Sequence, residues 1–316
     1  MTPSAAPLTR RPVSRRRVLL NVAHVVFLVT AVVFAGVSLR NQWSDIARDV
    51  AHITVWEWMV SLLAIYFGLL VFGLMWLRVL AGFGYRLHPI KGLGIFFVGQ
   101  LGRYIPGSVW SFGAQATMAR AVKVPPRVTV VAGLIGLGFS LATAGVVGLI
   151  AVAVGVLPVA IPAWIAVTLS VLVVGVLLSP LINFIGTRVA GKAETLTLRV
   201  RDVLVIIALL AVTWLMDGVA LMVLSGGFDR PEFHWGEQLW LMIGAYALSY
   251  VVGVVIIFAP AGLGAREAAV TFLLAPAIGV PAAAALALVS RLPMVIADFS
   301  LALVFWSLRN RGKTSG

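Results

Sequence analysis

Residues 99–126 read GQLGRYIPGSVWSFGAQATMARAVKVPP, and residues 253–281 read GVVIIFAPAGLGAREAAVTFLLAPAIGVP. In both stretches an apolar run stops at a Pro that is accompanied by Gly and Arg. A helix-like stretch follows, and another Pro precedes a long apolar span. The internal prolines, Pro106 and Pro260, are 154 positions apart. Interrupted hydrophobic segments at corresponding places in two halves of a chain are typical of transporters and indicate where the binding site lies. Because a broken helix leaves backbone N–H and C=O groups unpaired, we expect protein or a polar cavity to cover both breaks.

The composition excludes an ordinary soluble domain. Of the 316 residues, 61% are hydrophobic and only 11% are charged, with a mean hydropathy of +1.06, whereas about 25% of the residues of a soluble domain are charged. The apolar runs are too numerous for a single anchor. We therefore predict an all-α polytopic membrane protein with about six to eight transmembrane helices and no separate soluble catalytic domain.

The formal net charge of +13 comes from basic residues that flank the apolar segments. Membrane topology and attraction to anionic lipid explain this placement better than nucleic-acid binding does. There is no cysteine, and the four histidines are scattered. No metal-ligand spacing, nucleotide-binding loop or nucleophile–base arrangement is readable, so we expect no cofactor, no metal and no enzymatic activity.

The apolar pattern predicts one membrane domain, residues 18–308, between a basic tail of residues 1–17 and a short tail of residues 309–316. A repeat would divide it into one half over about 58–156 and another over about 203–308. The expected spans are residues 18–39, 58–80, 127–156, 163–183, 203–224 and 282–308.

The first break predicts a re-entrant helical hairpin. Residues 92–105 are too short to cross a bilayer at 1.5 Å per residue, and residues 108–122 can return as a helix. The arms of the second break, within 238–280, are each long enough to cross, so this segment is either a second hairpin or two full spans. If the first break is re-entrant, all Lys and Arg clusters fall on one side, and the positive-inside rule places both termini in the cytoplasm.

Two hairpins would make the halves an inverted-topology repeat, the arrangement associated with alternating access. In that case each half consists of a span, a hairpin and a second span. The spans of the first half are residues 58–80 and 127–156, and they match residues 203–224 and 282–308 in the opposite orientation. Identity between the halves is weak, so this prediction depends on the positions of the breaks.

Charged residues inside apolar spans are functional candidates because burying a charge in lipid is costly. Helices that start after a break present free N–H groups, and Arg adds a bidentate donor suited to phosphate. We therefore predict a pocket for an anionic headgroup. The candidate binding residues are Arg103, Tyr104, Pro106, Gly107, Ser108, Pro260, Gly262, Gly264, Arg266, Glu267 and Arg291. The candidates for proton or ion coupling are Asp217, Glu267 and Asp298.

Structural roles are the alternatives. Arg103 could reach the cytoplasmic face, and Arg266 and Glu267 could neutralise each other. Asp217 or Asp298 could pair with Arg291 only to hold helices together.

Two motifs carry a family resemblance. GRYIPGSVW at residues 102–110 and PAGLGAREA at residues 260–268 together resemble the transmembrane-domain family of lysylphosphatidylglycerol synthases and its stand-alone flippase-like relatives. The resemblance spans roughly residues 18–308. It implies that the chain moves lipids between leaflets, with aminoacylated phosphatidylglycerol or polyprenyl-linked sugars as the substrates. The residues that match the family motifs are Gly102, Arg103, Tyr104, Pro106 and Gly107, and Pro260, Gly262, Gly264, Arg266 and Glu267.

The chain departs from the family pattern at three points. Ser108 stands where many relatives have Lys, and Ala261 stands where a second Gly is usual. No aminoacyl-transferase domain follows residue 308, so we expect no lysyl transfer.

These patterns predict translocation of an anionic phospholipid or a polyprenyl-phosphate-linked lipid across the cytoplasmic (inner) membrane of a bacterium. The expected partners are membrane lipids, with cell-envelope biosynthetic enzymes as further candidates and no nucleic acid. One alternative is a non-transporting scaffold for a cell-envelope glycosyltransferase, and another is a secondary transporter of a small solute. The sequence does not indicate the lipid, the direction, the energy source or the oligomeric state.

Overall fold

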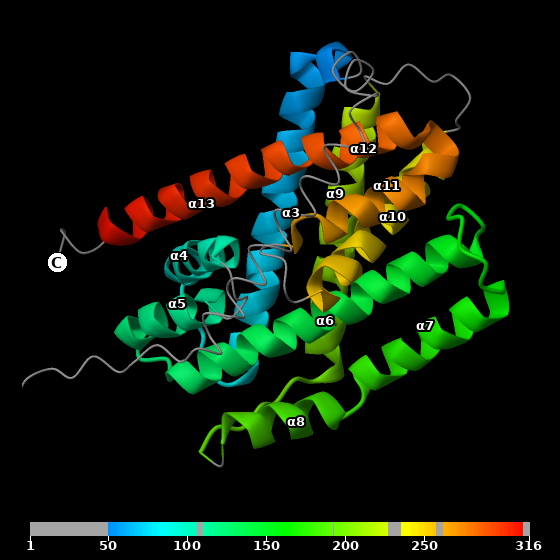
Figure 1. Cartoon of the computed structure of the whole chain (residues 1–316). Coiled ribbons are helices and arrows are strands. Elements are labelled where there is room, and N and C mark those ends of the chain that lie inside the picture. Colours follow the sequence, from blue (N-terminus) through cyan, green and yellow to red (C-terminus); the bar gives the residue numbers. More distant parts are fainter. Residues whose placement is uncertain (1–49, 106–109, 192, 227–234, 257–261, 312–316) are drawn as a thin grey trace, which may run out of the picture. The chain divides into compact units, whose positions relative to one another are not determined.

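The computed structural model describes residues 50–105, 110–191, 193–226, 235–256 and 262–311 (Figure 1). Within these residues the chain is helical and has no strand. The first half contains α3 (Val55–Gly82), α4 (Pro89–Gln100), η2 (Leu101–Tyr104), α5 (Trp110–Ala119), η3 (Arg120–Val122) and α6 (Pro126–Ala153). The rest contains α7 (Ala163–Leu178), α8 (Leu181–Ala190), α9 (Val200–Ser225), α10 (Trp235–Val255), α11 (Ala265–Ile278), α12 (Val280–Val289) and α13 (Arg291–Arg311).

Five described helical segments are long and apolar enough to cross a membrane, and a sixth results if the bent pair α7–α8 counts as one span. The five segments are Val55–Gly82, Pro126–Ala153, Val200–Ser225, Gly236–Val255 and Val280–Leu308. The prediction of an all-α polytopic membrane protein is confirmed. The expected spans 58–80, 127–156, 203–224 and 282–308 correspond to α3, α6, α9 and α12–α13, whereas the expected span 18–39 lies outside the described residues.

The expected single span over residues 163–183 is instead two helices, because the chain bends by 52° between α7 and α8. Pro180 has no N–H and disfavours helical geometry in the residue before it. Ser179 accordingly has extended backbone angles, with φ −76° and ψ 157°. A hydrophobicity pattern does not reveal this bend, because both helices remain apolar.

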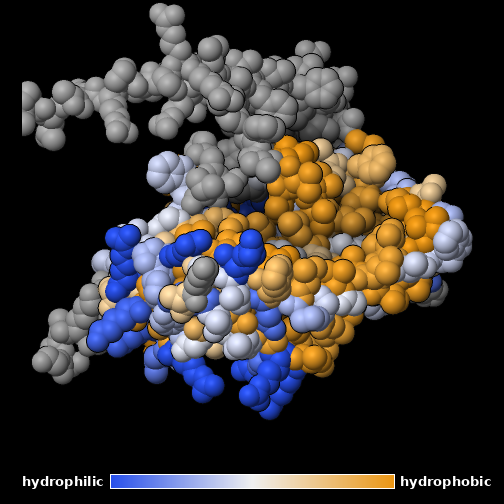
Figure 2. All heavy atoms as spheres, turned by 90° about the horizontal axis from the view of Figure 1, so that it is seen from below, coloured by the Kyte–Doolittle hydropathy of each residue, from blue (hydrophilic) through white to orange (hydrophobic). Residues whose placement is uncertain are grey.

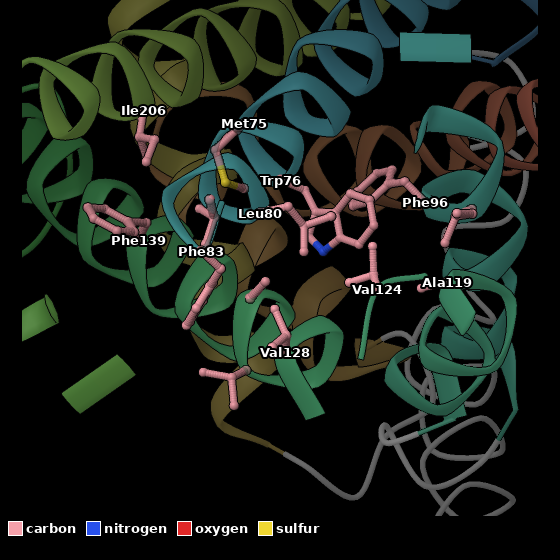
Figure 3. Close-up of a cluster of buried hydrophobic side chains, with 14 of the residues drawn as sticks. Met75, Trp76, Leu80, Phe83, Phe96, Ala119, Val124, Val128, Phe139 and Ile206 are labelled. Carbon is pink, nitrogen blue, oxygen red and sulfur yellow. The ribbon is translucent and has the colours of Figure 1, made fainter. Parts of the chain in front are cut away.

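The centre of the bundle is formed by α3 packed along α9. A small residue brings these helices close, since a Cβ on Gly68 would lie 3.3 Å from the Cβ of Met216. Such small-residue contacts are typical of helix packing in membranes. Around this pair lies a cluster of buried hydrophobic side chains from α3, α4, α6 and α9, which includes Trp76, Phe96 and Phe139 (Figure 3).

Many large apolar side chains remain outside this core. Examples are Leu63 and Phe67 of α3, Leu172 of α7 and Phe272 of α11, each more than half exposed. A water-soluble chain rarely leaves so much apolar surface uncovered, whereas lipid covers it at no cost. The fold is that of a multi-pass membrane protein.

Polar contacts hold several chain segments together at one end of the bundle. Arg78 forms an ion pair with Asp202 at 2.8 Å, and the Tyr85 hydroxyl donates to the Glu194 carboxylate at 3.0 Å. Arg127 donates from Nε to the backbone oxygen of residue 189 at 2.9 Å. These contacts bring three basic clusters, 78–91, 120–127 and 188–201, to the same end. Figure 2 shows strongly hydrophilic side chains gathered on the left of the face in view, with apolar ones covering most of the right.

Candidate functional site

The first break consists of two short helices that pack against each other. Helix α4 has 12 residues, so it extends only about 18 Å and does not cross a bilayer alone. Two glycines allow α5 to lie directly on α4 and η2. A Cβ on Gly102 would lie 2.5 Å from the backbone nitrogen of Ser111, and a Cβ on Gly99 would lie 2.2 Å from Cγ of Gln115.

The second break has a different construction. Helix α10 is long enough to cross a membrane, but α11 begins only at Ala265 and has 14 residues, about 21 Å. It is shorter than the sequence suggested, because Gly262 and Gly264 take positive φ angles of 71° and 83° before it begins. Glu267 stabilises the start of α11, since its carboxylate accepts from the Gly264 N–H at 2.7 Å.

Four predicted site residues, Pro106, Gly107, Ser108 and Pro260, lie outside the described residues. The others belong to η2, α9, the turn before α11, α11 and α13.

Both breaks open onto one cavity of about 600 Å³, a volume within the range of small-ligand sites. From the first break it is lined by Gln100, Arg103, Tyr104, Ser111, Phe112 and Gln115; from the second by Gly253, Val254, Val255, Gly262 and Arg266. Residues of α3, α6 and α13 also line it, among them Met75, Trp76, Leu137, Arg291 and Met294. The structure therefore brings Arg103, Arg266 and Arg291 to the same cavity, although they are far apart in the sequence.

An ion pair joins the first break to α13. Arg103 Nη2 lies 2.5 Å from Oδ1 of Asp298, and the Tyr104 hydroxyl donates to Oδ2 at 2.6 Å. Asp298 is only 2% exposed, so these two partners satisfy a carboxylate that burial would otherwise penalise. Arg103 is thus directed at α13 and the cavity.

A second ion pair joins the second break to the same helix. Arg291, the first residue of α13, donates from Nε to Glu267 Oε1. Glu267 therefore caps α11 with one oxygen and pairs with Arg291 through the other. The two alternatives from the sequence, a pair between Glu267 and its neighbour Arg266 and a pair between Arg291 and Asp217 or Asp298, are not what the structure contains.

Arg266 differs from the other two cavity arginines. It is 6% exposed, and its guanidinium lies over the ring of Tyr246, with Cζ 4.1 Å from the centroid. Nη1 lies 3.8 Å from the Met294 sulfur, a weak acceptor, and the buried Nη2 has no hydrogen-bond partner within the described part of the chain. Tyrosine rings stabilise a buried cation but offer it no anion.

Asp217 belongs to α9 and is partly buried. It is not among the described residues that line the cavity, although it lies within electrostatic range of Arg266 and Arg103. Asp217 is thus near the cavity arginines but does not line the cavity, whereas Asp298 and Glu267 are bonded to Arg103 and Arg291.

Sequence reasoning missed Tyr246 and Tyr250. Tyr250 lines the cavity, and both rings lie near the Arg266 guanidinium. The available signal was their spacing of four residues, which places both on one face of α10 just before the second break.

Comparison of the chain with models of known protein families and with curated proteins finds no match.

Proposed function

We propose that this chain binds an anionic lipid by its headgroup and moves it between the leaflets of a bacterial cytoplasmic membrane. The observation that carries this proposal is Arg266, a buried cation that lines the cavity and, unlike Arg103 and Arg291, forms no salt bridge within the described chain. A buried cation without a salt bridge is costly, so a site that keeps one is suited to an anionic ligand.

The surroundings of Arg266 support a lipid as that ligand. Beside the three arginines and the polar side chains of Gln100, Ser111 and Gln115, the cavity is lined mainly by apolar and aromatic residues, including Phe72, Trp76, Phe96 and Leu137. A lipid has the same two parts, a charged headgroup and an apolar hydrocarbon tail. The cavity also lies among helices that are long and apolar enough to span a membrane.

Both breaks take part in the proposed movement of the lipid. Each break is a re-entrant or interrupted segment, and the two halves form an inverted repeat that exposes the cavity to one leaflet and then to the other. The basic end of the bundle faces the cytoplasm together with both termini, in keeping with the positive-inside rule. Substrates are anionic phospholipids or polyprenyl-phosphate-linked lipids, and the chain is not an enzyme.

The test is a leaflet-exchange assay in proteoliposomes. A fluorescent anionic phospholipid and labelled phosphatidylcholine are followed with a membrane-impermeant quencher, for the wild-type protein and for Arg103→Ala/Arg266→Ala. Arg201→Ala is the matched control, because Arg201 is an exposed arginine at the start of α9.

We expect the wild type and Arg201→Ala to move the anionic lipid faster than phosphatidylcholine, and the double variant to lose this preference. If the wild type moves neither lipid, a scaffold for an envelope enzyme replaces a transporter as the favoured function. Transport of a water-soluble anion with no lipid movement would favour a small-solute transporter.

A further inference from the structure

The charges around the cavity can be counted. Among the described residues that line it, the cations are Arg103, Arg266 and Arg291. Asp298 neutralises Arg103, and Glu267 neutralises Arg291. Only Arg266 forms no salt bridge within the described chain, so it is the one cation lining the cavity that no described carboxylate contacts.

The neutralising carboxylates are fixed in place. Asp298 is held by both Arg103 and Tyr104, and Glu267 is held by Arg291 and by the N–H of Gly264. Releasing either carboxylate to make its arginine available to a ligand would break two hydrogen bonds and leave a largely buried charge without its partner. The ligand therefore meets one available cation rather than three.

Asp217 limits the positive potential further. It lies within electrostatic range of Arg266 and Arg103 without lining the cavity. A second negative charge on the ligand would thus have no free cation to pair with and would be repelled by three carboxylates near the site.

We infer that the cavity selects a headgroup with a single negative charge, namely a phosphodiester, and discriminates against phosphomonoesters and diphosphates. This inference rests on the proposed function and narrows its substrate class. A phosphodiester is the only charged group of anionic glycerophospholipids such as phosphatidylmethanol and of polyprenyl phosphosugars, and both satisfy the charge rule. Free polyprenyl phosphates, which carry about two negative charges at neutral pH, do not.

The experiment compares lipids whose headgroups differ in charge. Phosphatidylmethanol and phosphatidic acid with identical acyl chains differ by one methyl group, and at pH 8 the first carries one negative charge and the second about two. Phosphatidylcholine with the same chains is the reference with no net charge, because its phosphodiester is paired with its own choline cation. A polyprenyl phosphoglucose tests the alternative tail. Binding to the purified full-length protein is measured by native mass spectrometry.

For the wild type we expect phosphatidylmethanol to bind about tenfold more tightly than phosphatidic acid, a difference of about 1.4 kcal/mol. Asp298→Asn and Glu267→Gln each release a cavity arginine, so either variant should reduce or reverse this ratio. Arg266→Gln should remove the preference for phosphatidylmethanol over phosphatidylcholine, whereas Arg201→Gln should keep the wild-type pattern. If polyprenyl phosphoglucose binds more tightly than phosphatidylmethanol, polyprenyl phosphosugars are the favoured class of substrate.

Equal or tighter binding of phosphatidic acid by the wild type would overturn the charge rule and leave anionic-lipid binding in place. An unchanged ratio in both carboxylate variants would also overturn it. If the wild type binds neither anionic lipid better than phosphatidylcholine, the proposed function itself fails.

Discussion

Arg103 and Asp298 are 195 positions apart in the sequence and form an ion pair with an Nη2–Oδ1 distance of 2.5 Å. The pair connects the residues just before the first break to the middle of α13. Seven residues earlier on α13, Arg291 pairs with Glu267 beside the second break. Salt bridges therefore connect α13 to both breaks, and both salt bridges lie at the cavity.

Removing the Asp298 carboxylate should destabilise the protein. In Asp298→Ala the largely buried Arg103 guanidinium loses its counter-charge. We expect a loss of about 3 kcal/mol, the lower end of the range for breaking a buried pair, because the Arg103 side chain remains 23% exposed. Thermal unfolding in mild detergent measures the effect. The double variant Arg103→Gln/Asp298→Asn should recover part of the loss, and a double variant as unstable as Asp298→Ala would contradict the assignment.

Glu267 should show two separable effects. Glu267→Gln keeps an oxygen that can accept from the Gly264 N–H but removes the charge that pairs with Arg291. Glu267→Ala removes both, so it should lower stability by about 1 kcal/mol more, the usual value of a helix cap. The measurement is the unfolding midpoint of both variants under identical conditions. Equal midpoints would mean that the cap makes no contribution.

The close packing of the first break predicts a contrast between two glycines. A Cβ on Gly102 would lie 2.5 Å from the Ser111 backbone nitrogen, whereas a Cβ on Gly113, in α5, would meet nothing within 4 Å. Gly102→Ala should therefore destabilise the protein by about 1–3 kcal/mol through overpacking. Gly113→Ala should be neutral or stabilising by up to about 1 kcal/mol, because Ala favours a helix. Comparable losses in both variants would show that α5 does not pack on η2 in this way.

Proton coupling has a direct test. If a carboxylate carries a proton during transport, then at least one of the variants Asp217→Asn, Glu267→Gln and Asp298→Asn should stop responding to an imposed pH gradient. The readout is the rate of lipid exchange in proteoliposomes with and without the gradient. Wild-type behaviour in all three variants would exclude these residues as proton carriers.

The helical membrane fold could be predicted from the sequence alone. The boundaries of α3, α6 and α9 follow from the lengths of apolar runs, because a membrane span needs about 20 apolar residues and its backbone bonds are all local. The breaks near residues 106 and 260 were visible for the same reason, since Pro and Gly interrupt helices through local backbone geometry. The bend at Pro180 was missed because the apolar pattern continues across it.

The charge partners were decided only by the tertiary structure. From the sequence, Glu267 could have paired with its neighbour Arg266, and Asp298 could have paired with Arg291 on its own helix. In the folded chain α13 lies against both breaks, so Asp298 meets Arg103, Glu267 meets Arg291, and Arg266 is left over the ring of Tyr246. Residue types and local spacing determine which segments are helical and which charges are costly to bury. The partner of each charge depends on contacts between residues 20 or more positions apart, and helix packing sets these contacts.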